Sequence, residues 1–150
     1  MHLSDYLPAD HIITDLKGKR KIEIIDELLN LMRDLHLIKD FETALNDVMT
    51  REGHLSTGLE NGLAIPHAKT TEVEKLLMVF GLSRSGVEFE TLDGKPAELI
   101  FLVLSPHDTS GPHIQALAMI SRNLKNANIR KQLKEARTAQ EMSEIFASFS

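Results

Sequence analysis

Residues 51–68 have the sequence Arg-Glu-Gly-His-Leu-Ser-Thr-Gly-Leu-Glu-Asn-Gly-Leu-Ala-Ile-Pro-His-Ala, and neither helical nor strand periodicity runs through them. Three glycines and two hydroxyl residues lie in the first part, where glycine permits tight turns and close approach of backbone N–H groups to a ligand. A short apolar run over residues 63–65 leads to Pro66, whose locked φ restricts the backbone beside His67. The stretch therefore predicts a histidine held rigidly at the end of a strand, next to a loop lined with hydrogen-bond donors. This arrangement suits a side chain that must meet an anionic group.

Length and composition set the limits around this stretch. The chain has 150 residues, 42% hydrophobic and 26% charged, which predicts one globular domain over residues 1–150. A net charge of −5 without a strong basic cluster argues against a nucleic-acid partner. No apolar run has the length of a membrane span, the first residues lack a signal-peptide pattern, and there is no cysteine. We expect a cytoplasmic protein without direct membrane insertion and without disulfides.

Helices are predicted before the stretch and strands after it. A helical stripe of apolar residues covers residues 19–37, and Asp40 is placed to cap a second helix over residues 41–50. An early strand is expected at residues 12–13. Nearly continuous apolar runs at residues 75–82 and 99–104 are typical of buried central strands.

Three further helices are predicted in the last third of the chain. The first begins near Pro112, with Ser110 as its cap and Ile114 on its apolar face. The second covers residues 127–137, and Thr138 opens the third with a capping-box pattern. Helices at both ends with strands between them predict an α/β layered domain with the sheet in the middle.

The seven histidines differ in their value as site candidates. For three of them, a solvated or partly packed ring is the better interpretation: His2, His11 and His36. His54 lies in the glycine-containing stretch and is a lesser candidate. Three others follow predicted strand ends, the edge at which open α/β sheets carry their sites: His67, His107 and His113. A histidine at the edge of the core, without function, remains the alternative for His67.

Two other residues complete a phosphoryl-transfer set with His67. His113 lies at a predicted helix start, where free N–H groups and the helix dipole attract an anion and keep an imidazole neutral. Arg51 carries a planar fork that matches phosphate oxygens, although an arginine at a helix end is also common as a solvated cation. A nucleophilic imidazole, a second imidazole and a guanidinium would catalyse transfer by positioning and electrostatic stabilisation.

Competing motifs are absent, with one alternative left open. The chain has no Walker loop, no His-Glu-x-x-His motif and no Gly-x-Ser-x-Gly nucleophile elbow. The alternative is a metal hydrolase in which His107, Asp108 and His113 join His67 as ligands.

Residues 56–68 resemble the signature of the fructose/mannitol/nitrogen class (type 2) of enzyme IIA domains of the bacterial phosphoenolpyruvate-dependent phosphotransferase system (PTS). Residues 86–96 and 105–124 are similar to the same family, and the likeness extends over essentially the whole chain. The resemblance implies a single mixed β-sheet flanked by helices on both faces, and a phosphotransferase activity. It implies that His67 is phosphorylated by the phosphocarrier HPr or a paralogue and passes the group to an enzyme IIB domain of a sugar permease. We expect neither a cofactor nor a metal, because the protein itself supplies the positive charge.

The resemblance also implies roles for two other residues. His113 and Arg51 match the second active-site histidine and the active-site arginine of the family. We expect Ser56 and Thr57 to support the phosphoryl group. We expect an apolar rim to dock the partner protein, formed by Leu59, Leu63 and Ile65.

Glu60 departs from the family pattern, because members commonly have glycine at this position. Its carboxylate would repel an incoming phosphoryl group unless it points away. A nitrogen-type regulatory protein, whose phosphorylation state controls other proteins, is the alternative function. The sequence leaves open the sugar, the phosphorylated ring nitrogen and the oligomeric state, including a homodimer.

Overall fold

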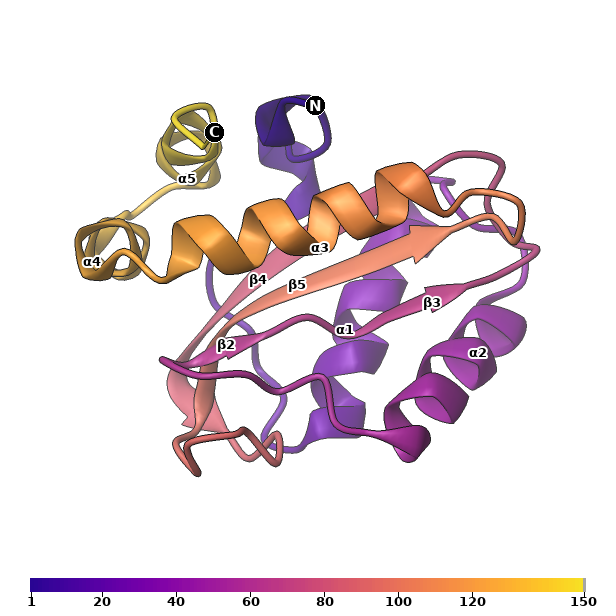
Figure 1. Ribbon diagram of the computed structural model, residues 1–150, viewed down its shortest axis with the longest axis horizontal. Coiled ribbons are helices and arrows are strands. Elements are labelled where there is room, and N and C mark those ends of the chain that lie inside the picture. The colour runs from indigo at the N-terminus through magenta and orange to yellow at the C-terminus, as the bar shows by residue number, and fades with distance from the viewer. Residues whose placement is uncertain (150) are drawn as a thin grey trace.

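The computed structural model describes residues 1–149, and a five-stranded mixed sheet forms its centre (Figure 1). Its strands are β1 (Ile12–Ile13), β2 (Leu63–Ala64), β3 (His67–Lys69), β4 (Leu77–Val87) and β5 (Ala97–Ser105). The order is β1-β4-β5-β2, and β3 also pairs with β5. β4 and β5 are antiparallel, whereas β1 runs parallel to β4, and β2 and β3 run parallel to β5. β2 and β3 are therefore two short segments along the same edge of β5.

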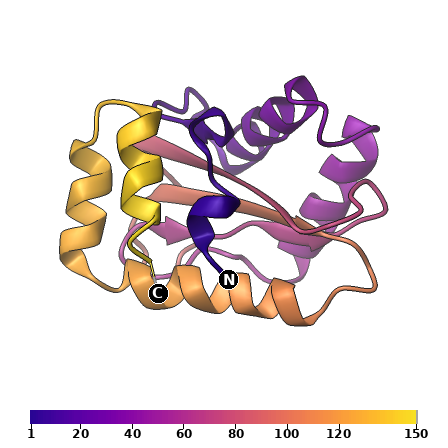
Figure 2. The same ribbon diagram turned by 90° about the horizontal axis from the view of Figure 1, so that it is seen from above.

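Helices cover both faces of this sheet, as Figures 1 and 2 show. α1 (Lys21–Asp34) and α2 (Phe41–His54) lie on one face. α3 (Gly111–Leu124), α4 (Ala127–Glu135) and α5 (Ala139–Phe146) lie on the other, together with the short 3-10 turn η1 (Leu3–Asp5). A second turn, η2 (Ala9–His11), leads into β1. The predicted α/β fold with one mixed sheet between helices is confirmed.

The two helical layers follow from the alternation of side chains along β5. Leu99, Phe101 and Val103 face the α3–α5 layer, and the residues between them face α1 and α2. All of these side chains are fully buried, and each burial contributes about 2 kcal/mol. Phe101 packs against Phe80 and Phe146, with ring centroids 4.7 and 5.6 Å away. Burial on both faces explains why β5 has a continuous apolar sequence.

α2 is one turn longer than the sequence predicts. Asp40 caps it as expected, since its side chain accepts hydrogen bonds from the N–H groups of Glu42 and Thr43. The helix continues through Gly53 to His54, so Arg51 is helical and does not begin a loop, as the sequence analysis supposed. Gly53 disfavours a helix by about 1 kcal/mol. The buried contacts of Glu52 described below fasten this last turn.

Other helix ends also differ from expectation. α1 ends at Asp34, three residues early, because the chain turns at His36 with a φ of 60°. Ser110 makes no side-chain cap to α3, and Ile114 is 64% exposed, so neither prediction for that helix start is correct. Thr138 does cap α5, accepting from the N–H of Glu141. Within residues 1–149, no helix combines the length and the apolar character that crossing a membrane requires.

Two glycines of the stretch give a test of the fold with an internal control. A Cβ on Gly58 would lie 2.6 Å from the carbonyl oxygen of Phe89 and 2.9 Å from a methyl carbon of Thr91. We predict that Gly58→Ala lowers the free energy of unfolding by about 1–3 kcal/mol, because the backbone must move to admit the methyl group. Urea denaturation measures this change.

Gly53→Ala is the matched control. No atom lies within 4 Å of a Cβ at this helical, exposed position. The same substitution should therefore raise the free energy of unfolding by about 0.5–1 kcal/mol. Equal destabilisation by both substitutions would contradict the packing described here.

Candidate functional site

His67 begins β3 directly after Pro66. Proline has no N–H to donate, so the pairing along β5 is interrupted between β2 and β3. The Pro66 carbonyl still accepts from the N–H of Val103 at 3.1 Å, and the Ile65 carbonyl lies 2.7 Å from His67 Nδ1. The rigid histidine after a proline is as predicted, but His67 starts a strand where the sequence analysis placed it at a strand end.

The Ile65 contact determines which ring nitrogen of His67 is available. A carbonyl oxygen only accepts, so Nδ1 carries the hydrogen, and Nε2 of the neutral ring keeps its lone pair. Burial lowers the pKa of His67 below its ordinary value of 6.5, and the charge of Arg51 acts in the same direction. The Ile65 bond and Glu52 oppose this shift without cancelling it. His67 is therefore a neutral imidazole with a nucleophilic Nε2 at pH 7.

A hollow of about 530 Å³ lies beside this ring. It is lined by residues from α2, β3 and α3: Asn46, Asp47, Thr50, Arg51, His54, His67, Ala68, Lys69 and His113. The rings of His67 and His113 meet edge to face, with centroids 5.3 Å apart. The structure thus brings together Arg51, His67 and His113, the three residues that the sequence selected from distant parts of the chain.

Arg51 is held at the last turn of α2. One guanidinium N–H donates to the carbonyl of Leu55 at 2.8 Å, which also satisfies a carbonyl just beyond the helix end. A guanidinium has five N–H donors in a planar fork, so others are left for an anion in the hollow. Its positive charge lowers the pKa of both His67 and His113.

His113 lies in the first turn of α3 and is 7% exposed. Burial first, and then the charges of His67, Lys69 and Arg51, together lower its pKa to about 4. Its Nδ1 lies 2.6 Å from the hydroxyl of Ser105, the last residue of β5. Two neutral imidazoles and two fixed cations therefore surround the hollow at pH 7, an environment that attracts a phosphoryl group.

Lys69 is a residue that the sequence analysis missed. It follows His67 by two positions in the same strand, so both side chains leave the same face of β3. The two-residue spacing is visible in the sequence, but it places both side chains on one face only if residues 67–69 form a strand. Lys69 also pairs in register with Ser105, which places it close to His113.

Ser56 and Thr57, which we expected to support the phosphoryl group, do not line the hollow. The Ser56 hydroxyl donates to the carbonyl of Phe89. Thr57 donates both its N–H, at 2.7 Å, and its hydroxyl to the carboxylate of Glu52. These hydroxyls hold the loop between α2 and β2.

Glu52, in the last turn of α2, is the buried residue to which this loop is bound. Its side chain is 3% exposed and pairs with Lys21 Nζ at 3.2 Å. The Thr57 carbonyl in turn accepts from the N–H of Ile65 at 3.1 Å. A continuous series of hydrogen bonds therefore runs from α1 through Glu52, Thr57 and Ile65 to the His67 ring.

The predicted apolar rim is wrong for two of its three residues. Leu63 and Ile65 are 4% and 3% exposed and belong to the core beneath α3, because β2 is covered on both faces. Leu59 is half-buried and lines a different hollow. The exposed apolar residues next to the site are Leu55, directly after α2, and Ile114, beside His113.

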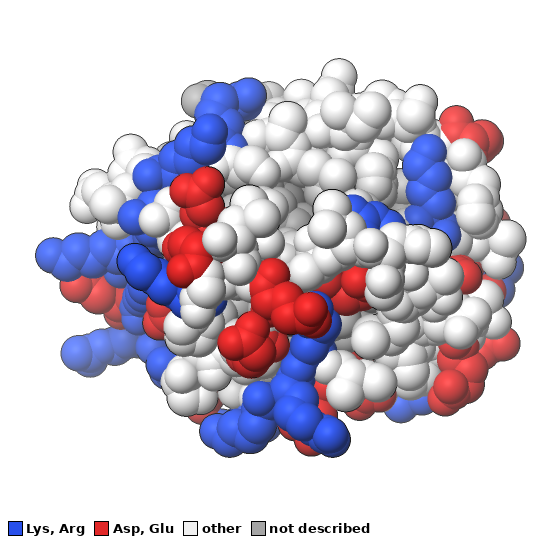
Figure 3. Space-filling view, turned by 60° about the horizontal axis from the view of Figure 1, so that its bottom comes forward, with Lys and Arg blue, Asp and Glu red and all other residues white. Residues whose placement is uncertain are grey.

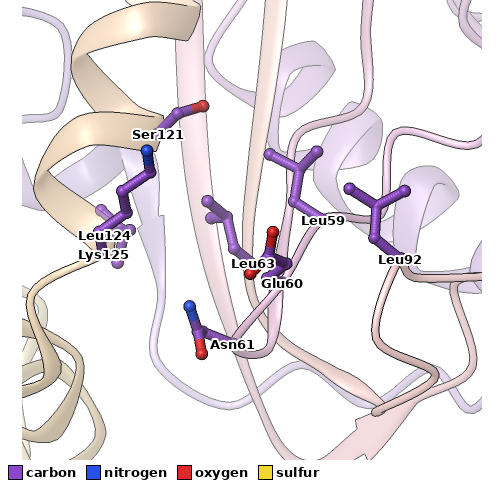
Figure 4. A pocket seen from close by; sticks show the side chains of 8 residues that line it. All are labelled: Leu59, Glu60, Asn61, Leu63, Leu92, Ser121, Leu124 and Lys125. Atoms are coloured by element: carbon purple, nitrogen blue, oxygen red, sulfur yellow. The ribbon is translucent and has the colours of Figure 1, made fainter.

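Glu60 lies away from His67. Figure 4 shows it in a separate hollow of about 210 Å³, with Asn61, Ser121 and Lys125 among its neighbours. Leu63 pairs with Leu99 but His67 pairs with Val103, four residues farther along β5. That separation is about 13 Å of strand. The carboxylate that replaces the family's glycine therefore does not face the imidazole.

The metal alternative receives no support from the arrangement. His107 is exposed and does not line the hollow that contains His67 and His113. In the part of the chain that the structure describes, no three His, Asp or Glu side chains are grouped in a way that could hold a metal ion.

On the face shown in Figure 3, basic side chains are interspersed with acidic ones and do not form one continuous basic patch.

The family described as "Phosphoenolpyruvate-dependent sugar phosphotransferase system, EIIA 2" matches residues 5–149. The chain belongs to this EIIA type 2 family. PTS IIA domains mediate phosphoryl transfer, so the chemistry of the hollow agrees with the family.

Relatives within the family carry two kinds of name. The chain is 34% identical over 145 residues to a PTS system fructose-specific EIIA component from Haloferax volcanii, covering 97% of this chain and 94% of the relative. It is 32% identical over 148 residues to a nitrogen regulatory protein from Bradyrhizobium diazoefficiens, covering 98% and 95%. A fructose-specific EIIABC component from Bacillus subtilis is 34% identical over 97% of this chain, which spans only 23% of that longer protein.

Solved structures agree with the fold. Nitrogen regulatory protein IIA-Ntr from Neisseria meningitidis superposes with a TM-score of 0.89 at 30% identity, covering 96% of this chain and 98% of that one. The IIA mannitol domain of Escherichia coli, solved in complex with phosphorylated enzyme IIB mannitol, superposes with a TM-score of 0.79 at 22% identity over 94% and 96%. At that identity the second likeness establishes the fold alone.

The buried ion pair behind the site gives a second prediction. Lys21→Met leaves the Glu52 carboxylate buried without its cation, and we expect a loss of about 2 kcal/mol in the free energy of unfolding. The control is Lys17→Met, because the Lys17–Asp15 pair is exposed, at 79% and 50% of the two side chains. Urea denaturation should show no measurable change for the control. Equal midpoints for both variants would contradict a structural role for the Glu52 network.

Proposed function

We propose that the chain is a phosphohistidine carrier of the PTS, accepting a phosphoryl group from HPr or a paralogue on His67 and passing it to an enzyme IIB domain. The observation that carries this proposal is the Ile65 bond, which leaves a neutral Nε2 open beside two cations and a second imidazole. Family membership supports the reaction class, and the fructose-specific relatives support a sugar pathway. We also propose that the protein is cytoplasmic, which family membership supports.

The transfer follows from the geometry of the hollow. The His67 Nε2 lone pair attacks the phosphorus of the donor's phosphohistidine, and the bond between phosphorus and the donor nitrogen breaks. The electron pair of that bond returns to the donor ring. Arg51 and Lys69 stabilise the charge on the phosphoryl oxygens, and His113 lines the same hollow with its ring against that of His67. In the second transfer, the acceptor's nucleophile attacks the phosphorus, the bond between phosphorus and His67 Nε2 breaks, and its electron pair returns to the His67 ring.

A second candidate function uses the same chemistry for regulation. Similarity to nitrogen regulatory proteins, including IIA-Ntr from Neisseria meningitidis, favours a protein whose phosphorylation state is sensed by others. The two functions differ in the partner of the phosphorylated form. Affinity capture with phosphorylated protein should recover a sugar-specific IIB protein in the first case and a kinase or regulator in the second.

We propose that Leu55 and Ile114 contact the partner protein. Both are large, exposed apolar residues: Leu55 directly follows α2, which carries Arg51, and Ile114 is on α3, which carries His113. Burying them at an interface would remove water from the hollow, which strengthens its electrostatic interactions.

The first test is phosphorylation itself. Incubation with phosphoenolpyruvate, enzyme I and HPr should place acid-labile phosphate on wild-type His67, detected by mass spectrometry. We predict that His67→Ala abolishes labelling, because the variant lacks the nucleophilic Nε2 that accepts the phosphoryl group. Arg51→Lys should slow labelling about tenfold, because lysine keeps the charge but loses the fork. His107→Ala, an exposed histidine outside the hollow, is the control and should label at the wild-type rate; robust labelling of His67→Ala would refute the proposal.

The docking surface is tested by a pair of equally exposed leucines. Leu55 is 72% exposed beside the hollow, and Leu92 is 73% exposed next to the separate hollow that holds Glu60. We predict that Leu55→Asp raises the KM for phosphorylated HPr about tenfold, because it places a charge in the interface. Leu92→Asp should leave the KM unchanged. Equal effects of the two variants would exclude docking through Leu55.

A further inference from the structure

The second imidazole of the site makes a buried hydrogen bond whose direction matters. Ser105 is fully buried, and its hydroxyl oxygen lies 2.6 Å from His113 Nδ1. Ser105 is on the same face of β5 as Phe101 and Val103, by strand alternation, and this face packs against α3. No other side-chain bond of the Ser105 hydroxyl or the His113 ring occurs among the described residues.

The direction of this bond follows from the position of the hydroxyl proton. If Nδ1 donated to the hydroxyl, the serine proton would be buried without an acceptor, which is unfavourable. If the hydroxyl donates to Nδ1, every buried polar atom of the pair is satisfied. In a neutral imidazole, a lone pair on Nδ1 requires the hydrogen on Nε2. The low pKa of His113, about 4, keeps the ring neutral at pH 7, so this argument applies under working conditions.

We propose that Ser105 is a positioning residue that holds His113 as its Nε2–H tautomer, so that this ring donates a hydrogen bond to a phosphoryl oxygen in the hollow. The two histidines then have opposite tautomers. The Ile65 carbonyl keeps Nε2 of His67 bare for attack, and the Ser105 hydroxyl keeps Nε2 of His113 protonated for stabilisation. The donation to phosphate rests on the proposed function, whereas the tautomer does not.

Removing the Ser105 hydroxyl should leave the His113 ring without the hydrogen bond that selects its tautomer. Without Ser105 as donor, both tautomers of neutral His113 become populated, and one of them turns a lone pair toward the phosphoryl oxygens. Loss of one oriented hydrogen bond in the transition state corresponds to a rate reduction of about three- to tenfold.

The experiment is long-range 1H–15N correlation NMR of protein labelled with 15N-histidine, at pH 7. We expect wild-type His113 as the Nε2–H tautomer and His67 as the Nδ1–H tautomer. Ser105→Ala should show averaged nitrogen shifts for His113 alone, with a three- to tenfold slower transfer from phosphorylated HPr. Ser105→Thr keeps the hydroxyl and should restore both the tautomer and the rate.

Ser83→Ala is the matched control. Ser83 is also fully buried in a strand, but its hydroxyl has no hydrogen-bond partner among residues 1–149. This variant should change neither the His113 shifts nor the rate. An Nδ1–H tautomer of His113 in the wild type, or unchanged His113 shifts in Ser105→Ala, would overturn the proposal, even if the variant transfers slowly. Absence of wild-type labelling at His67 would instead refute the phosphocarrier function, and the NMR result would still decide the tautomer.

Discussion

The hydrogen bond from His67 Nδ1 to the Ile65 carbonyl is the contact on which the site depends. It orients the ring, fixes its tautomer and leaves the Nε2 lone pair free on a ring that lines the hollow. The carbonyl is held because the N–H of Ile65 donates to Thr57, which is bound to the buried Glu52–Lys21 pair. Pro66 contributes by interrupting the pairing with β5 between the end of β2 and the start of β3, so the carbonyl of Ile65 is available to the His67 side chain. The orientation of one imidazole is thus determined by α1, α2 and the sheet together.

The electrostatics of the hollow suit the reversible binding of an anionic group such as a phosphoryl group. Burial keeps both imidazoles neutral, since the pKa of each is lowered, while Arg51 and Lys69 supply permanent positive charge. Exchange between two phosphohistidines is close to balanced in free energy, so a carrier must stabilise the transition state more than the bound group. Fixed donors around a half-buried nucleophile achieve this without a rearrangement of charge. The Glu60 carboxylate does not disturb this balance, because it faces another hollow.

Local signals in the sequence were sufficient for the fold, and together with the family resemblance they selected Arg51, His67 and His113 as the site candidates. Helical stripes, the Asp40 cap and the apolar runs of β4 and β5 are properties of neighbouring residues, and the structure confirms them. Contacts between distant residues could not be predicted in this way. In the sequence, Glu52 looks like any charged residue in a helix, and only the structure shows its contacts with Lys21 and Thr57. Likewise, only the packing of α3 on β5 shows that Ser105 contacts His113. The rim residues Leu63 and Ile65 were misjudged because an apolar run does not reveal whether its faces are covered by other elements.

The central claim is that Nε2 of His67 is the atom that carries the phosphoryl group. Phosphorus–nitrogen coupling in the NMR spectrum of the phosphorylated, 15N-histidine-labelled protein identifies that atom directly. The account predicts coupling of the phosphorus to Nε2 of His67, with Nδ1 still bearing its hydrogen. Coupling to Nδ1 of His67, or to a nitrogen of any other histidine, would contradict it.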